Sequence, residues 1–190
     1  MQDASEIRVF PDLEALEVVD EERPQEPSSI KELLLFLVKI VSIITVLVLL
    51  FTFVLGATRY QESSMYPAIK DGDLVIFQRY TPESYLPQEV VALSVEGEIQ
   101  IRRVVATAGD KVDITEDGLV INGAPQQEMG ISQNTERYLE GVSLPLFVPE
   151  GQVFLLGDNR TESTDSRIYG CVEIESILGK VMMIIRKRGI

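Results

Sequence analysis

The stretch from residue 62 to 79 places a serine hydroxyl on a backbone that its neighbours hold rigid. Ser64 stands before Met65, and Pro67 follows two residues later. The proline ring fixes its own φ and biases the preceding Tyr66 towards an extended conformation, which keeps the segment out of a helix. Ser64 is therefore a candidate nucleophile on exposed, rigid backbone. A serine before a proline turn is also common in ordinary loops, where it is only solvated or caps a turn.

The composition limits the partners that such a serine can have. The chain of 190 residues has no histidine and one cysteine, Cys171. A Ser-His-Asp triad is excluded because no imidazole can take the serine proton. A zinc site built from the usual Cys and His ligands and a catalytic Cys-His pair are also excluded. Any serine chemistry in this chain therefore needs another base.

Two further stretches combine tight turns with several polar side chains. The first, residues 102–110, joins an expected strand to a Gly-Asp turn. The second, residues 157–167, follows an apolar run and reads Gly-Asp-Asn-Arg-Thr-Glu-Ser-Thr-Asp-Ser-Arg. Such a loop can be a solvated surface whose Asp-Arg pairs contribute little stability. Its density of hydrogen-bonding groups exceeds what a connecting loop requires, which favours a functional role.

An apolar run upstream of the serine is expected to anchor the chain in a membrane. Residues 40–58 are nineteen residues without a charge, and residues 33–38 extend the run across Lys39, whose long side chain can snorkel. About 20 apolar residues match the hydrocarbon thickness of a bilayer. A buried core helix is disfavoured because no charged face exists, and a cleavable signal peptide because a long acidic leader precedes the run. We therefore expect a transmembrane helix over residues 33–58.

The segment before the anchor, residues 1–32, is acidic and contains several prolines. It carries ten acidic residues against Arg8, Arg23 and Lys31, which gives −7 of the chain's net charge of −13. We expect a largely disordered tail. Its charge argues against nucleic-acid binding, which needs clustered Lys and Arg. Basic residues flank the apolar run on both sides, so the positive-inside rule hardly decides its orientation.

After residue 58 the pattern changes to short β-type runs separated by turns. The expected strands lie near 74–77, 89–95, 99–106, 111–115, 119–121, 152–156 and 177–186, with turns at Glu96-Gly97, Asp117-Gly118 and Asn122-Gly123. Because no long helical segment separates these runs, we expect a mainly β domain over residues 59–190. Residues 124–145 are expected to form an irregular insertion in it.

Taken together, these stretches resemble the bacterial type I signal peptidases, membrane-anchored serine proteases that remove signal peptides from exported proteins. The similarity runs from about residue 33 to 186, and the last stretch matches a highly specific motif almost residue for residue. The matching segments, in chain order, are Ser64-Met65-Tyr66-Pro67, Gly72-Asp73, Arg103-Val104-Val105 with Gly109-Asp110, and residues 157–167.

The resemblance implies a serine and lysine dyad, in which a neutral lysine amine takes the serine proton and the serine attacks the scissile carbonyl. It makes Ser64 the nucleophile and gives Ser163 the task of orienting the base. It also implies that Asp165 and Arg167 tie the last loop together. The other supporting residues of that motif are Asp158, Asn159 and Arg160. The absence of histidine fits this scheme.

The resemblance further implies where the protein works and on what. Its partners would be the lipid bilayer and the signal peptides of exported precursors, with shallow apolar pockets that accept small side chains before the cleavage point. The anchor would cross a bacterial cell membrane once and leave the C-terminal domain on the extracytoplasmic side. No cofactor or metal is implied.

Two positions depart from the family pattern. The family's lysine stands directly before the Arg-Val-Val segment, where this chain has Arg102. A guanidinium stays protonated in proteins, so Arg102 cannot readily serve as the base that a lysine could become. The resemblance assigns the oxyanion region to the Ser64 backbone N–H and to a side-chain donor at the position of Glu62. An ionised carboxylate there only accepts hydrogen bonds.

Three hypotheses remain open at this point. In the first, the protein is an active signal peptidase with an unusual base, for which Glu62 is a candidate, while Arg102 stabilises developing negative charge. In the second, a non-catalytic family member binds exported or pilus-type precursors and assists their processing or assembly. In the third, a tethered β domain has only a structural role. The retained Ser64 and the intact last motif favour the first hypothesis, whereas Arg102 and Glu62 favour the second.

Overall fold

The computed structural model describes residues 29–80, 82–128, 130–131 and 133–187. The disorder expected for the acidic tail falls on residues outside these ranges and stays a prediction. The chain divides into two compact units, Met1–Ser42 and Ile43–Ile190. All the candidate site residues lie in the second unit.

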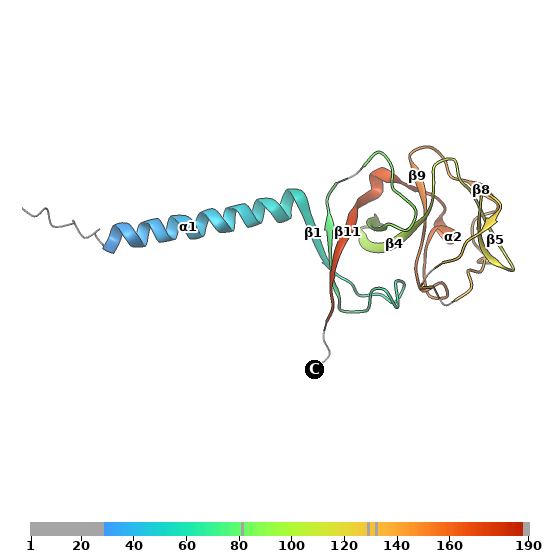
Figure 1. Cartoon of the computed structure of the whole chain (residues 1–190), viewed down its shortest axis with the longest axis horizontal. Helices are drawn as coiled ribbons and strands as arrows, with labels where there is room; N and C mark the ends of the chain where they lie inside the picture. Colours follow the sequence, from blue (N-terminus) through green and yellow to red (C-terminus); the bar gives the residue numbers. More distant parts are fainter. Residues whose placement is uncertain (1–28, 81, 129, 132, 188–190) are drawn as a thin grey trace, which may run out of the picture. The chain divides into compact units, whose positions relative to one another are not determined.

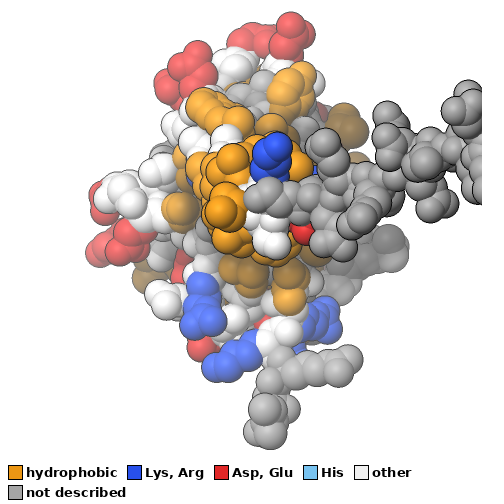
Figure 2. All heavy atoms as spheres, turned by 90° about the vertical axis from the view of Figure 1, so that its left-hand side faces the viewer, with side chains coloured by type: hydrophobic (Ala, Val, Ile, Leu, Met, Phe, Trp, Pro, Cys, Tyr) orange, Lys and Arg blue, Asp and Glu red, His pale blue; other side chains and the backbone are white. Residues whose placement is uncertain are grey.

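The apolar run forms one long helix (Figure 1). α1 covers Ser29–Leu49 and continues as the π-helical segment η2, Leu50–Val54. Every residue from 29 to 54 is exposed, and hydrophobic side chains gather over the helix in the space-filling view (Figure 2). An exposed helix that is apolar all round suits the interior of a bilayer, where every backbone polar group must be satisfied within the helix. With 26 residues it is long enough to cross a membrane.

The helix ends before the apolar run does. The expected span of 33–58 includes residues that instead form strand β1, Leu55–Arg59, which pairs with strand β2, Leu74–Gln78. The pairing needs a small residue, because a Cβ at Gly56 would lie 2.3 Å from ring atoms of Phe77. Strand pairing therefore determines the conformation at this point, although the composition still resembles that of the anchor.

The larger of two antiparallel sheets has seven strands in the order β1-β2-β11-β3-β4-β9-β10. The strands after β2 are β3 (Val90–Val95), β4 (Glu98–Thr107), β9 (Gln152–Leu156), β10 (Val172–Glu173) and β11 (Ile177–Ile185). The predicted mainly β fold is confirmed. Strands overlap every run predicted from the sequence, and β1, β10 and, in the smaller sheet, β7 (Ala124–Pro125) and β8 (Leu146–Phe147) are additions that the sequence pattern did not indicate.

The smaller sheet has four strands in the order β7-β6-β5-β8. Its strands are β5 (Lys111–Thr115), β6 (Gly118–Ile121), β7 (Ala124–Pro125) and β8 (Leu146–Phe147). Most of the segment 124–145, expected to be irregular, connects β7 to β8 without further strands or helices among its described residues. The described part of the domain also contains two short helices, α2 (Ser166–Tyr169) and the 3-10 helix η3 (Ile174–Ser176).

Three hydrophobic clusters fill the domain, and burial of their apolar surface is the main force that holds the sheets together. One cluster joins the two sheets: Val105, Ala106, Phe154 and Leu156 from the larger sheet meet Val112, Ile114 and Leu119 from the smaller. A second lies around β3, β4, β9 and η3. The third packs beneath the Ser64 segment and contains Tyr60, Met65, Ile69, Val75, Phe77, Ala92 and Ile101.

Strand β4 brings the stretch at 102–110 and the stretch at 157–167 together. Arg102 and Arg103 are consecutive on this strand and therefore point to opposite faces of the sheet. Arg103 lies opposite Leu156 at the end of β9. The loop that follows β9 consequently starts beside both arginines, and it contains the motif at 157–167.

Candidate active site

Ser64 lies in the segment between β1 and β2, and the loop after β9 holds its backbone. The Asn159 N–H donates to the Ser64 carbonyl over 2.9 Å, and Asn159 Nδ2 donates to the carbonyl of Ser63 over 3.2 Å. The sequence predicted an exposed serine, but Ser64 is only 2% exposed. The prediction was wrong because side chains from β4 and from just before Ser64 enclose its hydroxyl.

Among the described residues, three side chains contact the Ser64 hydroxyl. Ser64 Oγ lies 2.7 Å from Glu62 Oε2, 2.8 Å from Arg102 Nη1 and 2.8 Å from the hydroxyl of Tyr60. A carboxylate can only accept a hydrogen bond and a guanidinium can only donate one. Ser64 therefore donates its proton to Glu62 and accepts a hydrogen bond from Arg102.

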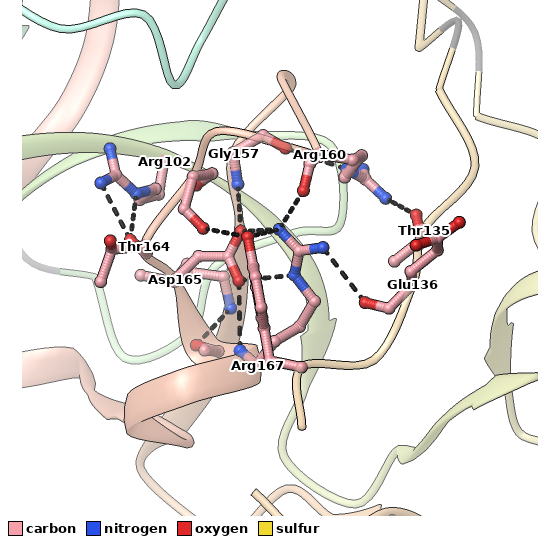
Figure 3. A network of polar contacts seen from close by, with 12 residues as sticks. Arg102, Thr135, Glu136, Gly157, Arg160, Thr164, Asp165 and Arg167 are labelled. Atoms are coloured by element: carbon pink, nitrogen blue, oxygen red, sulfur yellow. Dashed lines mark hydrogen bonds and ion pairs between the residues drawn. The ribbon is translucent and has the colours of Figure 1, made fainter. Parts of the chain in front are cut away.

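Arg102 is buried and held by several acceptors. Its side chain is 1% exposed, and Nη1 also forms an ion pair of 3.1 Å with Glu62 Oε2. Nε and Nη2 both donate to the backbone carbonyl of Thr164, over 3.1 and 3.0 Å (Figure 3). A further bond of 2.6 Å joins Nη1 to the carbonyl of Ile101. These bonds fix a positive charge beside the serine, where it can stabilise negative charge that develops on oxygen.

Ser163, expected to orient the base, has a different environment. Among the described residues its buried hydroxyl has no hydrogen-bond partner, and Arg102 uses the carbonyl of the next residue, Thr164, instead. Ser163 packs against Gly157, where a Cβ would lie 2.2 Å from Ser163 Oγ and 2.6 Å from the carbonyl oxygen of Ser64. Glycine at this position lets the last loop approach the Ser64 segment closely.

Asp165 and Arg167 form the centre of a buried network in the last loop (Figure 3). Arg167 Nε and Nη2 donate to the two oxygens of Asp165 over 2.8 and 2.9 Å, and both side chains are at most 2% exposed. Asp165 also accepts from the Gly157 N–H over 3.1 Å, and Arg167 donates to the Arg160 carbonyl over 2.7 Å. This bidentate pair therefore links the two ends of the loop.

The remaining residues of the motif tie the loop to other parts of the domain. Asp158 accepts two hydrogen bonds from Arg103, of 2.7 and 2.6 Å, and these bonds raise the pKa of the Arg103 guanidinium. Arg160, fully buried, donates to both carboxylate oxygens of Glu128 over 2.6 and 2.5 Å. The loop is thus fastened to β4 and to the 124–145 segment.

Sequence reasoning missed Tyr60, Thr164 and Glu128. In the sequence Tyr60 looks like an ordinary core aromatic residue. Nothing in the sequence shows that its hydroxyl reaches Ser64. Thr164 takes part through its backbone carbonyl, which no side-chain pattern reveals. Glu128 lies in an irregular segment 32 residues before its partner Arg160, a separation that no motif spans.

A surface cavity of about 680 Å³ opens at Ser64. Its walls contain both acidic and apolar groups. The lining residues are Gln61, Glu62, Ser63, Ser64, Tyr66, Ile69, Lys70, Asp71 and Glu162. The cavity is thus lined by both the serine and its carboxylate partner.

The chain that carries this site is similar to known sequences. The family described as "Signal peptidase, peptidase S26" matches residues 32–186, most of the chain. The chain belongs to this family. Membership confirms the resemblance to the signal peptidases and makes this protein a signal peptidase I-like serine endopeptidase. Its long apolar helix is suited to anchoring it in a membrane.

Individual relatives agree with this assignment. Signal peptidase IB of Staphylococcus aureus (strain Mu50) is 30% identical over 168 residues, which cover 80% of this chain and 88% of the relative. The probable signal peptidase I-1 of Synechocystis is 31% identical over 150 residues, covering 72% of this chain and 74% of the relative. Thylakoidal processing peptidase 1 of Arabidopsis thaliana is 31% identical over 134 residues; the match covers 63% of this chain but only 38% of that protein.

A solved structure also matches. It is the crystal structure of a signal peptidase I from Enterococcus faecalis V583, which is 29% identical. The match has a TM-score of 0.46 and covers 52% of this chain and 97% of that one.

Proposed function

We propose that this signal peptidase family member cleaves signal peptides from exported precursor proteins, with Ser64 as the nucleophile and Glu62 as the base. The observation that carries the proposal is the 2.7 Å hydrogen bond from Ser64 Oγ to Glu62 Oε2. A general base must lie within about 2.6–3.2 Å of the group whose proton it takes. Glu62 meets this condition, so the site has a proton acceptor although Arg102 replaces the family's lysine.

In the proposed acylation step the Ser64 O–H bond breaks and its proton moves to Glu62. Oγ forms a bond to the scissile carbonyl carbon, and the carbonyl oxygen becomes an oxyanion. The Ser64 N–H has no acceptor among the described residues, so it is available to donate to this oxygen. When the intermediate collapses, the C–N bond breaks and the leaving amine takes the proton from Glu62. An acyl-enzyme on Ser64 remains, which water hydrolyses with Glu62 as the base.

Arg102 acts in this scheme as an electrostatic group that keeps its proton. Its Nη1 bonds both to the nucleophile and to Glu62, so it holds the carboxylate in position and favours negative charge on Oγ. A carboxylate is a weaker base than an amine, and stabilisation of the alkoxide compensates for this. Arginine therefore has a function that differs from that of a dyad lysine.

The helix α1 and the cavity beside Ser64 indicate where the protein acts and where its substrate binds. We infer that α1 spans a bacterial cell membrane and that the β domain lies on the extracytoplasmic side, where precursors emerge. The cavity beside Ser64 would hold the residues that flank the cleavage point. Asp165 and Arg167, with Asp158, Asn159 and Arg160, would support the loop that positions Arg102.

The test is cleavage of a precursor with a small-x-small site by the full chain in detergent, compared with Ser64→Ala. Ser94→Ala, a change at an exposed serine on β3, is the matched control. We expect cleavage by the wild type and by Ser94→Ala, and none by Ser64→Ala. Equal cleavage by Ser64→Ala would contradict the proposal.

The presence of Arg102 in place of the family's lysine favours a second candidate function. In it, the protein is not catalytic but binds precursors and assists their processing or assembly. In that case the wild type and Ser64→Ala would bind the precursor with equal affinity and neither would cleave it. Measuring binding of a fluorescent precursor peptide together with cleavage separates the two functions.

A further inference from the structure

We propose that Tyr60 is a further catalytic residue, whose hydroxyl donates a hydrogen bond to Ser64 Oγ and stabilises the alkoxide that forms as the proton passes to Glu62. This inference rests on the function proposed above. It concerns a residue that contacts the reacting oxygen itself, four positions before the nucleophile.

Two hydrogen bonds fix the Tyr60 hydroxyl at the nucleophile. Its oxygen lies 2.8 Å from Ser64 Oγ, and it accepts the N–H of Met65 over 2.8 Å. The ring is 2% exposed and belongs to the hydrophobic cluster beneath the Ser64 segment. The phenol therefore cannot turn away without disturbing the core, and its oxygen is held where Oγ becomes charged.

The direction of the bond between Tyr60 and Ser64 follows from the partners of the serine. A serine hydroxyl has one proton to donate and two lone pairs that can accept. Its proton goes to the Glu62 carboxylate and one lone pair accepts from Arg102. Tyr60 must consequently donate its proton to the second lone pair, and the Met65 N–H occupies the acceptor side of the phenol.

The hydrogen bond from Tyr60 matters because the base at this site is a carboxylate. Transfer of a hydroxyl proton to a carboxylate is strongly uphill, so the step depends on stabilisation of the alkoxide. When the proton leaves, Oγ gains a third electron pair that can attack the carbonyl carbon. Tyr60 and Arg102 can meanwhile keep their hydrogen bonds to the other two pairs. The Tyr60 O–H bond stays intact throughout, and no proton leaves the phenol.

The charges around Tyr60 keep it in the donating form. Burial raises the pKa of Tyr60 above its ordinary value, and the Glu62 carboxylate raises it further. The hydrogen bonds that Tyr60 forms with Ser64 and Met65, together with the charge of Arg102, act in the opposite direction without reversing the shift. The phenol thus remains protonated at neutral pH and keeps its hydrogen bond to the serine.

Tyr60→Phe removes the hydroxyl and keeps the ring, and Tyr85→Phe is its matched control. Tyr85 is also 2% exposed, and its hydroxyl has no hydrogen-bond partner among the described residues. We expect Tyr60→Phe to lower kcat about tenfold to a hundredfold, as for loss of a hydrogen bond to a charged group, with KM changed less than about twofold. Tyr85→Phe should leave both constants unchanged. Equal kcat for wild type and Tyr60→Phe would overturn the proposal.

Two further measurements separate catalysis from support of the loop. In the Ser64→Ala background, Tyr60→Phe should leave the Kd of the precursor peptide unchanged; weaker binding would mean that Tyr60 only shapes the loop. The second-order rate of Ser64 labelling by a fluorophosphonate should fall with kcat in Tyr60→Phe, and an unchanged rate would count against the donor role. If the wild type labels at Ser64 but cleaves no precursor, the proposed function fails while the labelling rates still test Tyr60. A wild type that neither cleaves nor labels overturns both proposals.

Discussion

Arg102 Nη1 donates a hydrogen bond of 2.8 Å to Ser64 Oγ, although the family resemblance places a proton-accepting lysine at this position. We predict that Arg102→Lys lowers cleavage roughly tenfold or more, because the single ammonium nitrogen cannot occupy the positions of Nη1, which bonds to Ser64 and Glu62, and of Nε and Nη2, which bond to the Thr164 carbonyl. Initial rates at saturating precursor measure this, with Arg137→Lys, an exposed arginine, as the control. A strong increase in cleavage would instead identify Arg102 as a disabled dyad position and exclude Glu62 as the working base.

Ser163 gives a prediction that separates this site from a lysine-based one. Its hydroxyl is buried without a hydrogen-bond partner among the described residues, so removal of the oxygen loses no bond. We expect Ser163→Ala to leave kcat within about twofold and to change the free energy of unfolding by less than about 1 kcal/mol. Steady-state kinetics and urea unfolding test both values. A hundredfold loss of activity with an unchanged fold would show that Ser163 orients the catalytic groups after all.

The Asp165–Arg167 pair should contribute strongly to stability because it is fully buried. Asp165→Asn leaves the Arg167 guanidinium without its charged partner, and breaking a buried pair in this way costs about 3–5 kcal/mol. Asp113→Asn, in a pair whose arginine is 50% exposed, should cost about 0–1 kcal/mol. Denaturant unfolding in detergent gives both values. Equal losses would contradict the central place given to Asp165 in the last loop.

Stability should fall on the alkaline side because of buried tyrosines. Burial raises the pKa of Tyr85 and of Tyr169 to about 12, and the ordinary value is 10. The unfolded chain therefore loses these protons from about pH 10, whereas the folded chain retains them until about pH 12. Stability is fully present below pH 10 and decreases as the pH rises from 10 to 12. Unfolding temperatures across this range should drop less steeply in Tyr85→Phe; identical slopes would contradict the assignment.

The sequence predicted most of the large sheet because its strands are short apolar runs ended by turn residues. It failed at Leu55–Arg59, where an apolar composition suited to a membrane helix hides the pairing of β1 with β2. The strand forms by pairing with β2, and glycine at position 56 leaves room for the Phe77 ring; no local pattern shows a pairing across that distance in the sequence.

The candidate site was predictable where side-chain identity alone carries the signal. Ser64 and the last motif could be selected from residue types and order, whereas Arg102 and Glu62 were singled out by the resemblance to the signal peptidase family. The burial of Ser64 and the part played by the Thr164 carbonyl could not, because they depend on β4 and the loop after β9 meeting in space. The catalytic roles of Ser64, Glu62 and Arg102 stay predictions.

The most direct test of the site is the rate of precursor cleavage by Glu62→Gln. Glutamine keeps the size of the side chain and can still accept a hydrogen bond, but it cannot take up the serine proton. We predict a fall in kcat of about a hundredfold or more, as for loss of a general base, while Glu150→Gln, an exposed control before β9, keeps the wild-type rate. An unchanged kcat in Glu62→Gln would contradict the assignment of Glu62 as the base that activates Ser64.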